Sequence, residues 1–359
     1  MDFVIFHKSA AFCIWAMVVI CTNRAHAVDV YWKGNSHSWR VNGQWSPSGE
    51  PKAADNVFIN TGSGTITLSA GEVASSLNVS ASGWTLSGGT LQLDSTGTIN
   101  VDNGLGTPMT FTIDSSLVGT GVNIYKTGND TLVLTGANSY TGTTIVGTGI
   151  LNIQNSLALG TTAGGTTVSN GGELQLQGGI TVAGESLNLY GTGVTGSALK
   201  NVSGNNSFNG PVVLSGDTTV SSDSGLLTFD PLAGTAFSGA YGLTIGGVGD
   251  ITINDPIADL SSLTKTGTGT LTLNGINTYT GVTNVTQGTL ILNGSLSGSI
   301  NLTGGTIGGT GNFGDFTLNP GATLSPGNSG AAGKLNVANT TFLGGNYNLD
   351  IFGTSAGTT

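Results

Sequence analysis

The sequence predicts an all-β protein, a right-handed parallel β-helix (β-solenoid) with an N-terminal cap, and three observations support this. A long motif occurs twice, as "IYKTGNDTLVLTGANSYTG" at 124–142 and "LTKTGTGTLTLNGINTYTG" at 263–281. Shorter segments with period two recur across the rest of the chain, and no apolar pattern of period 3.6 follows residue 28. Glycine supplies 61 of the 359 residues, as expected for short strands joined by many turns. A long series of such strands is typical of a solenoid.

The chain begins with the pattern of a secretory signal peptide, which we assign to residues 1–27. A short charged segment precedes an apolar run at 10–21, and residues 25–27 read Ala-His-Ala, a small-x-small cleavage site. The run is too short to cross a bilayer as a helix, which needs about 20 residues. A lipoprotein anchored through Cys21 is an alternative. We expect export with cleavage after Ala27, so that the mature chain begins at Val28.

Residues 28–60 are expected to form a segment that caps the N-terminal end of the solenoid. Trp32, Trp39 and Trp45 lie close together in this segment. Their aromatic faces could stack on sugar rings, which makes them candidate ligand-binding residues. Alternatively, they close the end of the solenoid, because an uncapped β-helix exposes strand edges that promote aggregation. We favour the cap, since capping is required in repeat proteins and ligand binding is not.

The repeated motif predicts which side chains are buried. Over 126–158 and 265–297, 17 of 33 positions are identical. Leucine and threonine alternate in each copy, which indicates a strand with one buried face. Turns rich in Gly and Asn, residues that tolerate positive φ, follow each strand. In the second copy the expected inward residues are Leu271, Leu273, Val285, Leu290 and Leu292, and the expected outward residues are Thr270, Thr272 and Asn284.

Residues 61–359 are expected to form the β-helix repeats, with the strongest motifs at 124–155 and 263–293. The two copies are offset by 139 residues, which equals about six coils if each coil takes ~23 residues. Coils stack about 4.8 Å apart, so roughly 12 coils would form a rod on the order of 60 Å long.

The repeat "LTKTGTGTLTLNGINTYTGVTNVTQGTLIL" resembles the autotransporter-associated β-strand repeat of bacterial exported and surface proteins. Residues 263–293 match this pattern closely, and residues 124–155 match it less closely. Residues 30–59 and 319–353 resemble the opening and later segments of such passengers. The resemblance implies an exported β-helical passenger, and it implies no catalytic residues. The pattern stops mid-repeat at residue 359 without a membrane β-barrel, so we expect either a fragment that is truncated at the C-terminus or a divergent member.

Charge and cysteine content narrow the function classes. Cleavage after Ala27 removes one carboxylate and two basic residues of 19 and 9, which leaves 18 carboxylates against 7 lysines and arginines. This acidic balance argues against nucleic acid and anionic membrane surfaces as partners. Cleavage also removes both cysteines and leaves His37 as the only histidine. We therefore expect no disulfide, no transition-metal site and no cofactor.

Several short motifs invite an enzymatic interpretation. Lys126 and Lys265 each begin a Lys-Thr-Gly box like that of penicillin-interacting enzymes, and Ser197 with Lys200 forms an S-x-x-K. That chemistry needs the serine at a helix start and a third motif, and the sequence shows neither. We therefore expect both motif lysines to be solvated and structural. Asp250, Asp255 and Asp259 form a loose acidic group, but no calcium-binding nonapeptide is complete.

The favoured function is that of an exported, non-enzymatic passenger, a surface β-solenoid for adhesion or structural display. One alternative is a glycan-binding module that uses Trp32, Trp39 and Trp45, with an extracellular glycan or surface receptor as partner. A second alternative is a polysaccharide-acting β-helix enzyme, which would need paired carboxylates or carboxylate-bound calcium beside a base. The acidic residues are mostly single and spaced along the chain, which disfavours this alternative. The location expected in every case is secreted or cell-surface.

Overall fold

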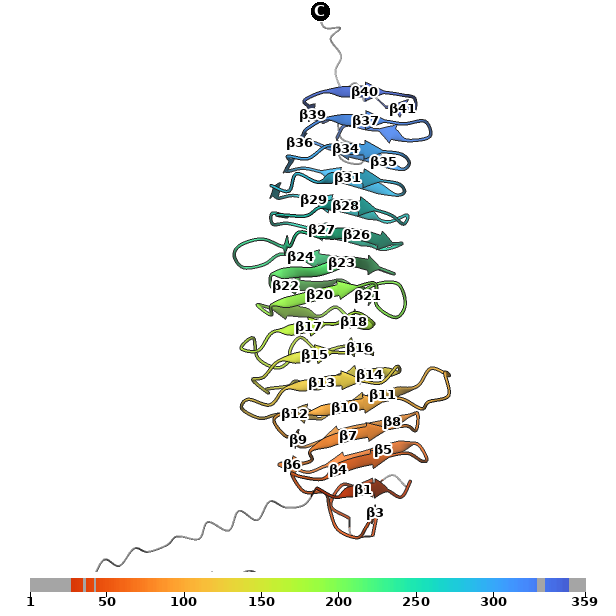
Figure 1. Cartoon of the computed structure of the whole chain (residues 1–359), viewed down its shortest axis with the longest axis vertical. Helices are drawn as coiled ribbons and strands as arrows, with labels where there is room; N and C mark the ends of the chain where they lie inside the picture. The colour runs from red at the N-terminus through yellow and green to blue at the C-terminus, as the bar shows by residue number, and fades with distance from the viewer. Residues whose placement is uncertain (1–26, 35–36, 42, 328–332, 349–359) are drawn as a thin grey trace, which may run out of the picture.

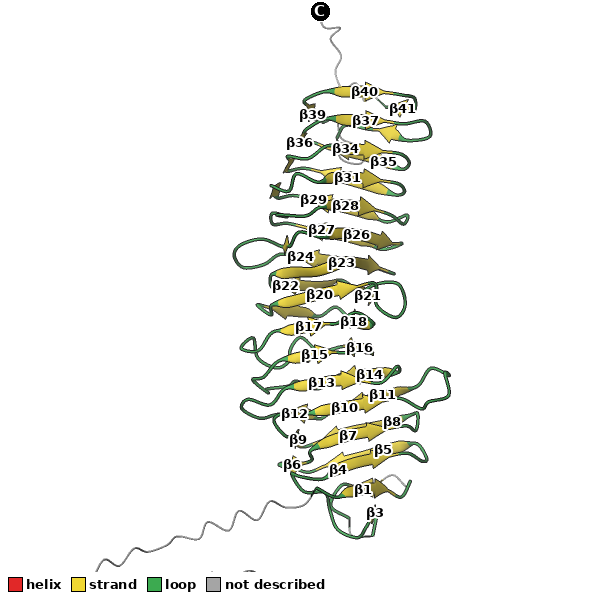
Figure 2. Cartoon of the chain, viewed as in Figure 1, coloured by secondary structure: helices red, strands yellow, loops and turns green. Residues whose placement is uncertain are grey.

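The computed structural model describes residues 27–34, 37–41, 43–327 and 333–348, and the chain is a parallel β-solenoid of about 14 turns (Figure 1). Strands joined by turns and loops make up this part of the chain, without any helix (Figure 2). The predicted fold class is confirmed. No helix that could cross a membrane occurs among these residues. Of the signal peptide predicted at 1–27, residues 1–26 lie outside the described ranges.

Each coil contributes up to three strands, which stack on the matching strands of neighbouring coils and so form three faces. Face 1 consists of β1 (Asp29–Trp32), β4 (Asn56–Ile59), β7 (Ser76–Val79), β10 (Thr98–Val101), β13 (Ile124–Thr127), β15 (Thr144–Val146), β17 (Thr166–Val168), β20 (Leu187–Gly191), the first part of β23 (Val212–Ser222), β25 (Phe237–Ser238), β30 (Ile276–Asn277), β33 (Ser295–Leu296), β36 (Asn312–Phe313) and β39 (Asn336–Val337).

Face 2 follows face 1 in each coil. It consists of β2 (His37–Ser38), β5 (Gly64–Leu68), β8 (Trp84–Gly88), β11 (Thr110–Ile113), β14 (Thr131–Leu134), β16 (Gly149–Ile153), β18 (Gly172–Gln177), β21 (Leu199–Ser203), the second part of β23, β26 (Gly242–Gly247), β28 (Ser262–Lys265), β31 (Val282–Val285), β34 (Ile300–Leu302), β37 (Phe316–Leu318) and β40 (Thr340–Phe342).

Face 3 completes the coil. It consists of β6 (Glu72–Val73), β9 (Thr90–Gln92), β12 (Ser116–Leu117), β19 (Thr181–Ala183), β22 (Asn206–Asn209), β24 (Leu226–Phe229), β27 (Asp250–Ile253), β29 (Thr270–Leu273), β32 (Thr289–Leu292), β35 (Thr306–Gly309), β38 (Thr323–Leu324) and β41 (Asn346–Tyr347). Two coils between β12 and β19 have no strand on this face, where they contact their neighbours through single backbone bonds such as Ser139 N to Leu117 O at 2.9 Å and through the side chain of Asn138.

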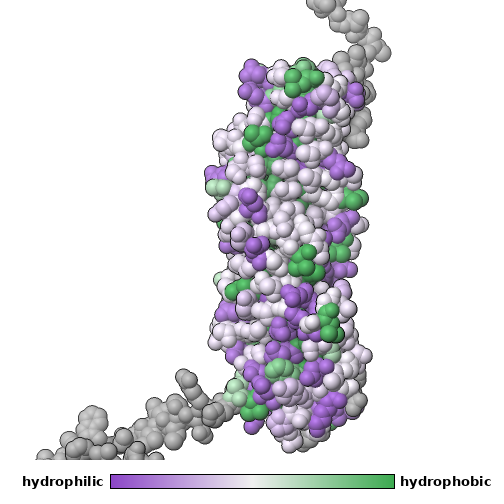
Figure 3. Space-filling view, turned by 45° about the vertical axis from the view of Figure 1, so that its right-hand side comes forward, coloured by the Kyte–Doolittle hydropathy of each residue, from purple (hydrophilic) through white to green (hydrophobic). Residues whose placement is uncertain are grey.

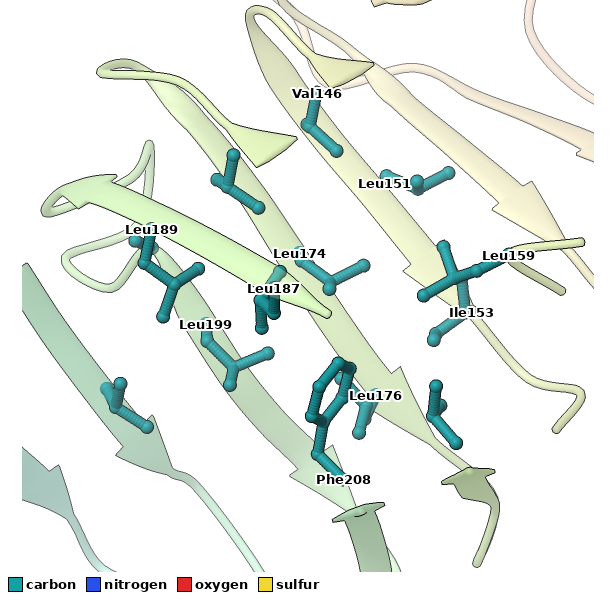
Figure 4. Close-up of a cluster of buried hydrophobic side chains, with 14 of the residues drawn as sticks. Val146, Leu151, Ile153, Leu159, Leu174, Leu176, Leu187, Leu189, Leu199 and Phe208 are labelled. Atoms are coloured by element: carbon teal, nitrogen blue, oxygen red, sulfur yellow. The ribbon is translucent and has the colours of Figure 1, made fainter. Parts of the chain in front are cut away.

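The core is a set of inward columns of apolar residues, each stacked on its equivalent in the next coil. Leu151, Leu174 and Leu199 form one such column across β16, β18 and β21, and each is fully buried (Figure 4). Burying a leucine contributes about 1.5–3 kcal/mol relative to leaving it exposed. Repetition of these columns therefore compensates for the near absence of charged interactions along the rod.

The predicted inward and outward residues of the repeat are confirmed. In β29, Leu271 and Leu273 are fully buried, whereas Thr270 and Thr272 are partly exposed. The three remaining inward predictions, on β31 and β32, are also fully buried, and Asn284 is partly exposed. Period two therefore identified the core face of these strands, because successive side chains of a strand point to opposite sides.

The two copies of the motif lie on different faces, which the sequence did not indicate. From Leu132 of the first copy, one column runs through Leu151, Leu174, Leu199, Val220 and Ile245 to Lys265 of the second copy. These six steps cover 133 residues (265 − 132), or about 22 per coil. The offset of 139 is therefore six coils plus one face, and the rod has about 14 coils where roughly 12 were expected.

The N-terminal end of the rod has its own strand arrangement. β3 (Trp45–Ser46) runs antiparallel to β1 and occupies the edge that no further coil covers, while β4 pairs with the other edge in parallel. Trp39 and Trp45 are fully buried at this end. The side chain of Arg40 donates to Glu72 on the neighbouring coil at 2.8 Å, which ties the segment to the rod. We retain as a proposal that residues 28–60 form the cap.

Candidate functional site

The three tryptophans singled out as candidate ligand-binding residues form one buried cluster. Trp32 is 1% exposed, and Trp39 and Trp45 are 0% exposed. Their rings meet edge to face, with centroids 4.7 Å apart for Trp32 and Trp45 and 4.9 Å apart for Trp39 and Trp45. Trp84, two coils further along the chain, joins the cluster with its ring centroid 6.1 Å from that of Trp32. No ring of the predicted trio presents a face to solvent, so a sugar could stack on these residues only if the segment opened.

The motif lysines are buried, so the expectation that they are solvated is wrong. Nζ of Lys265 donates to the backbone oxygens of Thr266 at 2.6 Å, Gly267 at 2.8 Å and Gln287 at 3.3 Å. Gln287 belongs to the following coil, and Gly288 beside it has a positive φ of 72° and would place a Cβ only 2.3 Å from the backbone oxygen of Gly267, so this position favours glycine. The Lys-Thr-Gly turn thus folds its own carbonyl groups around its lysine.

Lys126 repeats this arrangement in the first copy. Its Nζ donates to the oxygens of Thr127 and Gly128 at 2.8 Å each and of Thr148 at 3.2 Å. Burial lowers the pKa of Lys126 to about 8, against the opposing effects of Asp130 and Asp102. Burial likewise lowers the pKa of Lys265 to about 8. All three donors of each ammonium group are used, so the structural role expected for these lysines fits their geometry.

The other polar positions shared by the two copies also lie inside the rod. Asn277 is 1% exposed; its Oδ1 accepts from Ile257 N at 3.0 Å, and its Nδ2 donates to Ser295 O at 3.0 Å. Tyr279 is 1% exposed, and its hydroxyl lies 2.7 Å from Oγ1 of Thr283. The two asparagine bonds join one coil to its neighbours, whereas the tyrosine bond spans a corner within its own coil. The asparagine therefore acts through its side chain rather than through the positive φ that the turn pattern suggested.

The first copy makes the same contacts. Asn138 Oδ1 accepts from Leu117 N at 2.8 Å, and its Nδ2 donates to Ala158 O at 2.6 Å. The hydroxyl of Tyr140 lies 2.6 Å from Oγ1 of Thr144. Burial is the main cause that raises the pKa of Tyr140 and of its counterpart Tyr279, so both stay protonated at physiological pH.

The S-x-x-K pair does not form a nucleophile and base. Oγ of Ser197 bonds to Oγ of Ser221 at 2.7 Å, whereas Nζ of Lys200 reaches Oγ1 of Thr195 at 2.6 Å. Glu173, which is fully buried, accepts from Thr195 N and from its hydroxyl, each at 2.7 Å. The loop that contains Thr195 is thereby fastened over the outer side of face 2. This cluster was missed because Glu173 and Lys200 come from different coils.

The acidic residues do not assemble a metal centre in the described ranges, where no group of three or more His, Cys, Asp or Glu residues could hold an ion. Oδ1 of Asp250 instead accepts from Thr270 N at 2.7 Å. Burial, followed by the charge of Asp230, raises the pKa of Asp255. Asp259 has a positive φ of 63° at a turn. The three aspartates thus serve separate local roles.

The outer surface is mostly small and polar, with single apolar residues along the length of the face in view (Figure 3). Three tyrosines of the central coils are well exposed, namely Tyr125 at 41%, Tyr190 at 44% and Tyr241 at 42%. Sequence reasoning missed Tyr125 and Tyr190 as candidates. The sequence pattern that could have identified them is an aromatic residue at an outward position of a strand in which apolar inward residues alternate with polar outward ones.

Comparisons with known proteins agree with the resemblance noted in the sequence. Residues 124–153 and 263–292 match the passenger-associated-transport-repeat family. The chain is 34% identical over 193 residues to the BmaC autotransporter adhesin of Brucella suis biovar 1 (strain 1330). The match covers 48% of this chain but only 5% of that adhesin. No solved structure matches. The predicted resemblance to an autotransporter passenger repeat protein is confirmed.

Proposed function

We propose that this chain is an exported, non-enzymatic rod that serves a bacterial surface adhesin or displays a binding surface. Similarity to an autotransporter adhesin carries the proposal. Its location is the cell surface or the external medium, reached through a signal peptide that is cleaved after Ala27. N-terminal sequencing of secreted protein should therefore start at Val28, and retention of residues 25–27 would contradict the cleavage site.

The use of the charged groups supports a non-enzymatic role. The ammonium groups of Lys126 and Lys265 are enclosed by backbone oxygens. The carboxylate of Glu173 is engaged by a loop, and Lys200 donates to that same loop. In each case the hydrogen bonds stabilise a turn or a loop and leave no free acid and base facing each other across an open cleft, as bond cleavage requires.

Adhesion can be tested with the mature chain attached to latex beads. Beads should be retained on epithelial cells or extracellular matrix, free mature protein should compete for that retention, and albumin-coated beads should wash away. Retention equal to that of the albumin beads would refute adhesion. Release of reducing ends from polysaccharides by the same protein would instead support an enzyme.

A further inference from the structure

The outer side of face 1 carries two adjacent columns of residues without a charged side chain from β4 to β23. The first column is Asn56, Ser76, Thr98, Tyr125, Ile145, Thr167, Asn188 and Val213. The second is Phe58, Asn78, Asn100 and Thr127, followed by Gly147, Ser169 and Tyr190, which directly follow paired residues of β15, β17 and β20. In a chain of net charge −10, this strip is a neutral polar surface.

Two tyrosine rings lie against this strip because a glycine of the next coil makes room for each. A Cβ on Gly147 would lie 2.7 Å from Cε2 and 2.9 Å from Oη of Tyr125. A Cβ on Gly216 would lie 2.2 Å from Cδ2 and Cε2 of Tyr190. Each ring therefore rests on backbone at one side, while 41% of Tyr125 and 44% of Tyr190 remain exposed. A ring held in this way needs no ordering when a ligand stacks on it.

The two rings are separated along the rod axis by a regular distance. Tyr125 pairs with Ile145, which pairs with Thr167 and then with Asn188 of the strand that carries Tyr190. Three coils at about 4.8 Å each place the rings about 14 Å apart along the axis. The rise of one coil is close to the length of one hexose in an extended β-linked chain.

Polar groups and a shallow hollow lie between and beside the rings. A hollow of about 220 Å³ is lined by Thr167, Asn188 and Val213, among others. Oγ1 of Thr127 donates to Oδ1 of Asn100 at 3.2 Å beside Tyr125, and Oγ of Ser215 donates to Oδ1 of Asn188 at 2.6 Å beside Tyr190. Amides and hydroxyls next to exposed rings suit sugar hydroxyl groups, and the absence of lysine and arginine from the strip disfavours acidic sugars.

We propose that this strip of face 1 binds an extended, uncharged polysaccharide along the rod axis, with Tyr125 and Tyr190 as stacking platforms. The proposal rests on the adhesive function proposed above and names the class of ligand. It replaces the buried N-terminal tryptophans as the sugar-binding residues.

Calorimetric titration of the mature chain with neutral β-1,4-linked hexasaccharides of glucose, xylose and mannose tests the proposal. At least one should bind, and a hyaluronan hexasaccharide should not. Tyr125→Ala and Tyr190→Ala should each weaken binding roughly tenfold, the scale of a tyrosine hot spot. The wild type should bind the hexasaccharide more tightly than its trisaccharide, and Tyr190→Ala should reduce that difference because only one platform remains.

Matched variants separate ligand binding from stability. Gly147→Ala should weaken binding although Tyr125 is present, because the new Cβ displaces the ring, whereas Tyr125→Phe should bind like wild type. Tyr241→Ala, at an exposed tyrosine just before β26 on face 2, should leave binding unchanged. Lack of binding to every neutral hexasaccharide would overturn the proposal. So would tyrosine variants that bind like wild type and lose only melting temperature, because the rings would then simply pack on cross-strand glycines.

The bead assay distinguishes this proposal from the adhesive function. Beads that adhere although no neutral sugar binds would refute the polysaccharide site and leave adhesion standing. Sugar binding without bead adhesion would refute adhesion and leave the polysaccharide site standing.

Discussion

Replacing Asn277 by alanine tests whether its side-chain hydrogen bonds hold neighbouring coils together on face 1, where the strands are short. β30 has only two residues there, and the preceding coil contributes no named strand at Ile257. Asn277 accepts from Ile257 N in one coil and donates to Ser295 O in the other. Asn277→Ala removes both bonds, together with the bond from Nδ2 to Gly275 O at 3.0 Å in its own turn, and leaves the buried N–H of Ile257 and the partly buried C=O of Ser295 without these partners.

The expected loss follows from these two groups. Leaving one buried donor or acceptor unsatisfied costs about 1–3 kcal/mol. Two such groups, in a site where Asn277 is 1% exposed, predict a loss of about 2–5 kcal/mol in the free energy of unfolding. Asn274 provides a matched control, because it is exposed and bonds to Asn254 at 2.8 Å and to Asn293 at 2.9 Å. Water can replace those bonds, so Asn274→Ala should cost about 0.5 kcal/mol or less.

Hydrogen exchange is the decisive assay, since repeat arrays can unfold in sections and a single melt can then miss a local loss. Asn277→Ala should reduce protection at the Ile257 amide more than at amides several coils away. Denaturant unfolding should show a larger loss in the free energy of unfolding for Asn277→Ala than for Asn274→Ala. Equal costs for the two variants, or unchanged protection of Ile257, would refute the bridging role.

Three further predictions concern the core, pH and metal. Leu273→Ala should lower the free energy of unfolding by about 2–5 kcal/mol, and Thr272→Ala, at an outward position, by about 0.5 kcal/mol or less. Denaturant unfolding measures both losses. A larger loss for Thr272→Ala would mean that the inward and outward sides of β29 are misassigned. Stability should rise from about pH 8 to pH 10, because the two motif lysines have a pKa of about 8 when folded and 10.5 when unfolded, so the unfolded chain binds more protons in this window. A melting temperature that falls over this range, or an equal rise after both lysines are replaced by methionine, would contradict the assignment. A chelator should leave the melting temperature unchanged, given that the described residues form no metal-holding group; a large drop would point to a bound cation.

The sequence could predict the features that depend only on local periodicity, namely which side of a strand is buried and that the chain forms strands rather than helices. Alternation of leucine and threonine in β29 identifies a buried face without knowledge of any neighbour, because side chains alternate along every strand. The same pattern, repeated with glycine-rich turns, distinguishes a solenoid from a helical fold. Leu271, Leu273 and Thr272 therefore lie where the pattern placed them.

The features that sequence could not predict depend on contacts between coils. Lysine is almost never fully buried unless it is paired, so Lys265 was expected in solvent. The oxygens that enclose its Nζ come from its own turn and from a residue 22 positions later. Glu173 and Thr195 also lie 22 residues apart, and Tyr125 rests on Gly147 at the same separation. Other stacked pairs have a different separation, because Tyr190 rests on Gly216, 26 residues later, so no fixed spacing in the sequence reveals which residues will stack.

The change of face between the two copies explains what the motif specifies. Lys126 lies on face 1 and Lys265 on face 2, yet each binds two oxygens of its own turn and one of the next coil. Asn138 and Asn277 likewise keep their partners in neighbouring coils after the shift, and Tyr140 and Tyr279 each keep a bond to the threonine four residues later. Since each of these contacts is made either within the motif's own turn or with an adjacent coil, none requires a particular face. The motif therefore specifies a turn together with its connection to the adjacent coils, and it does so from face 1 in the first copy and from face 2 in the second.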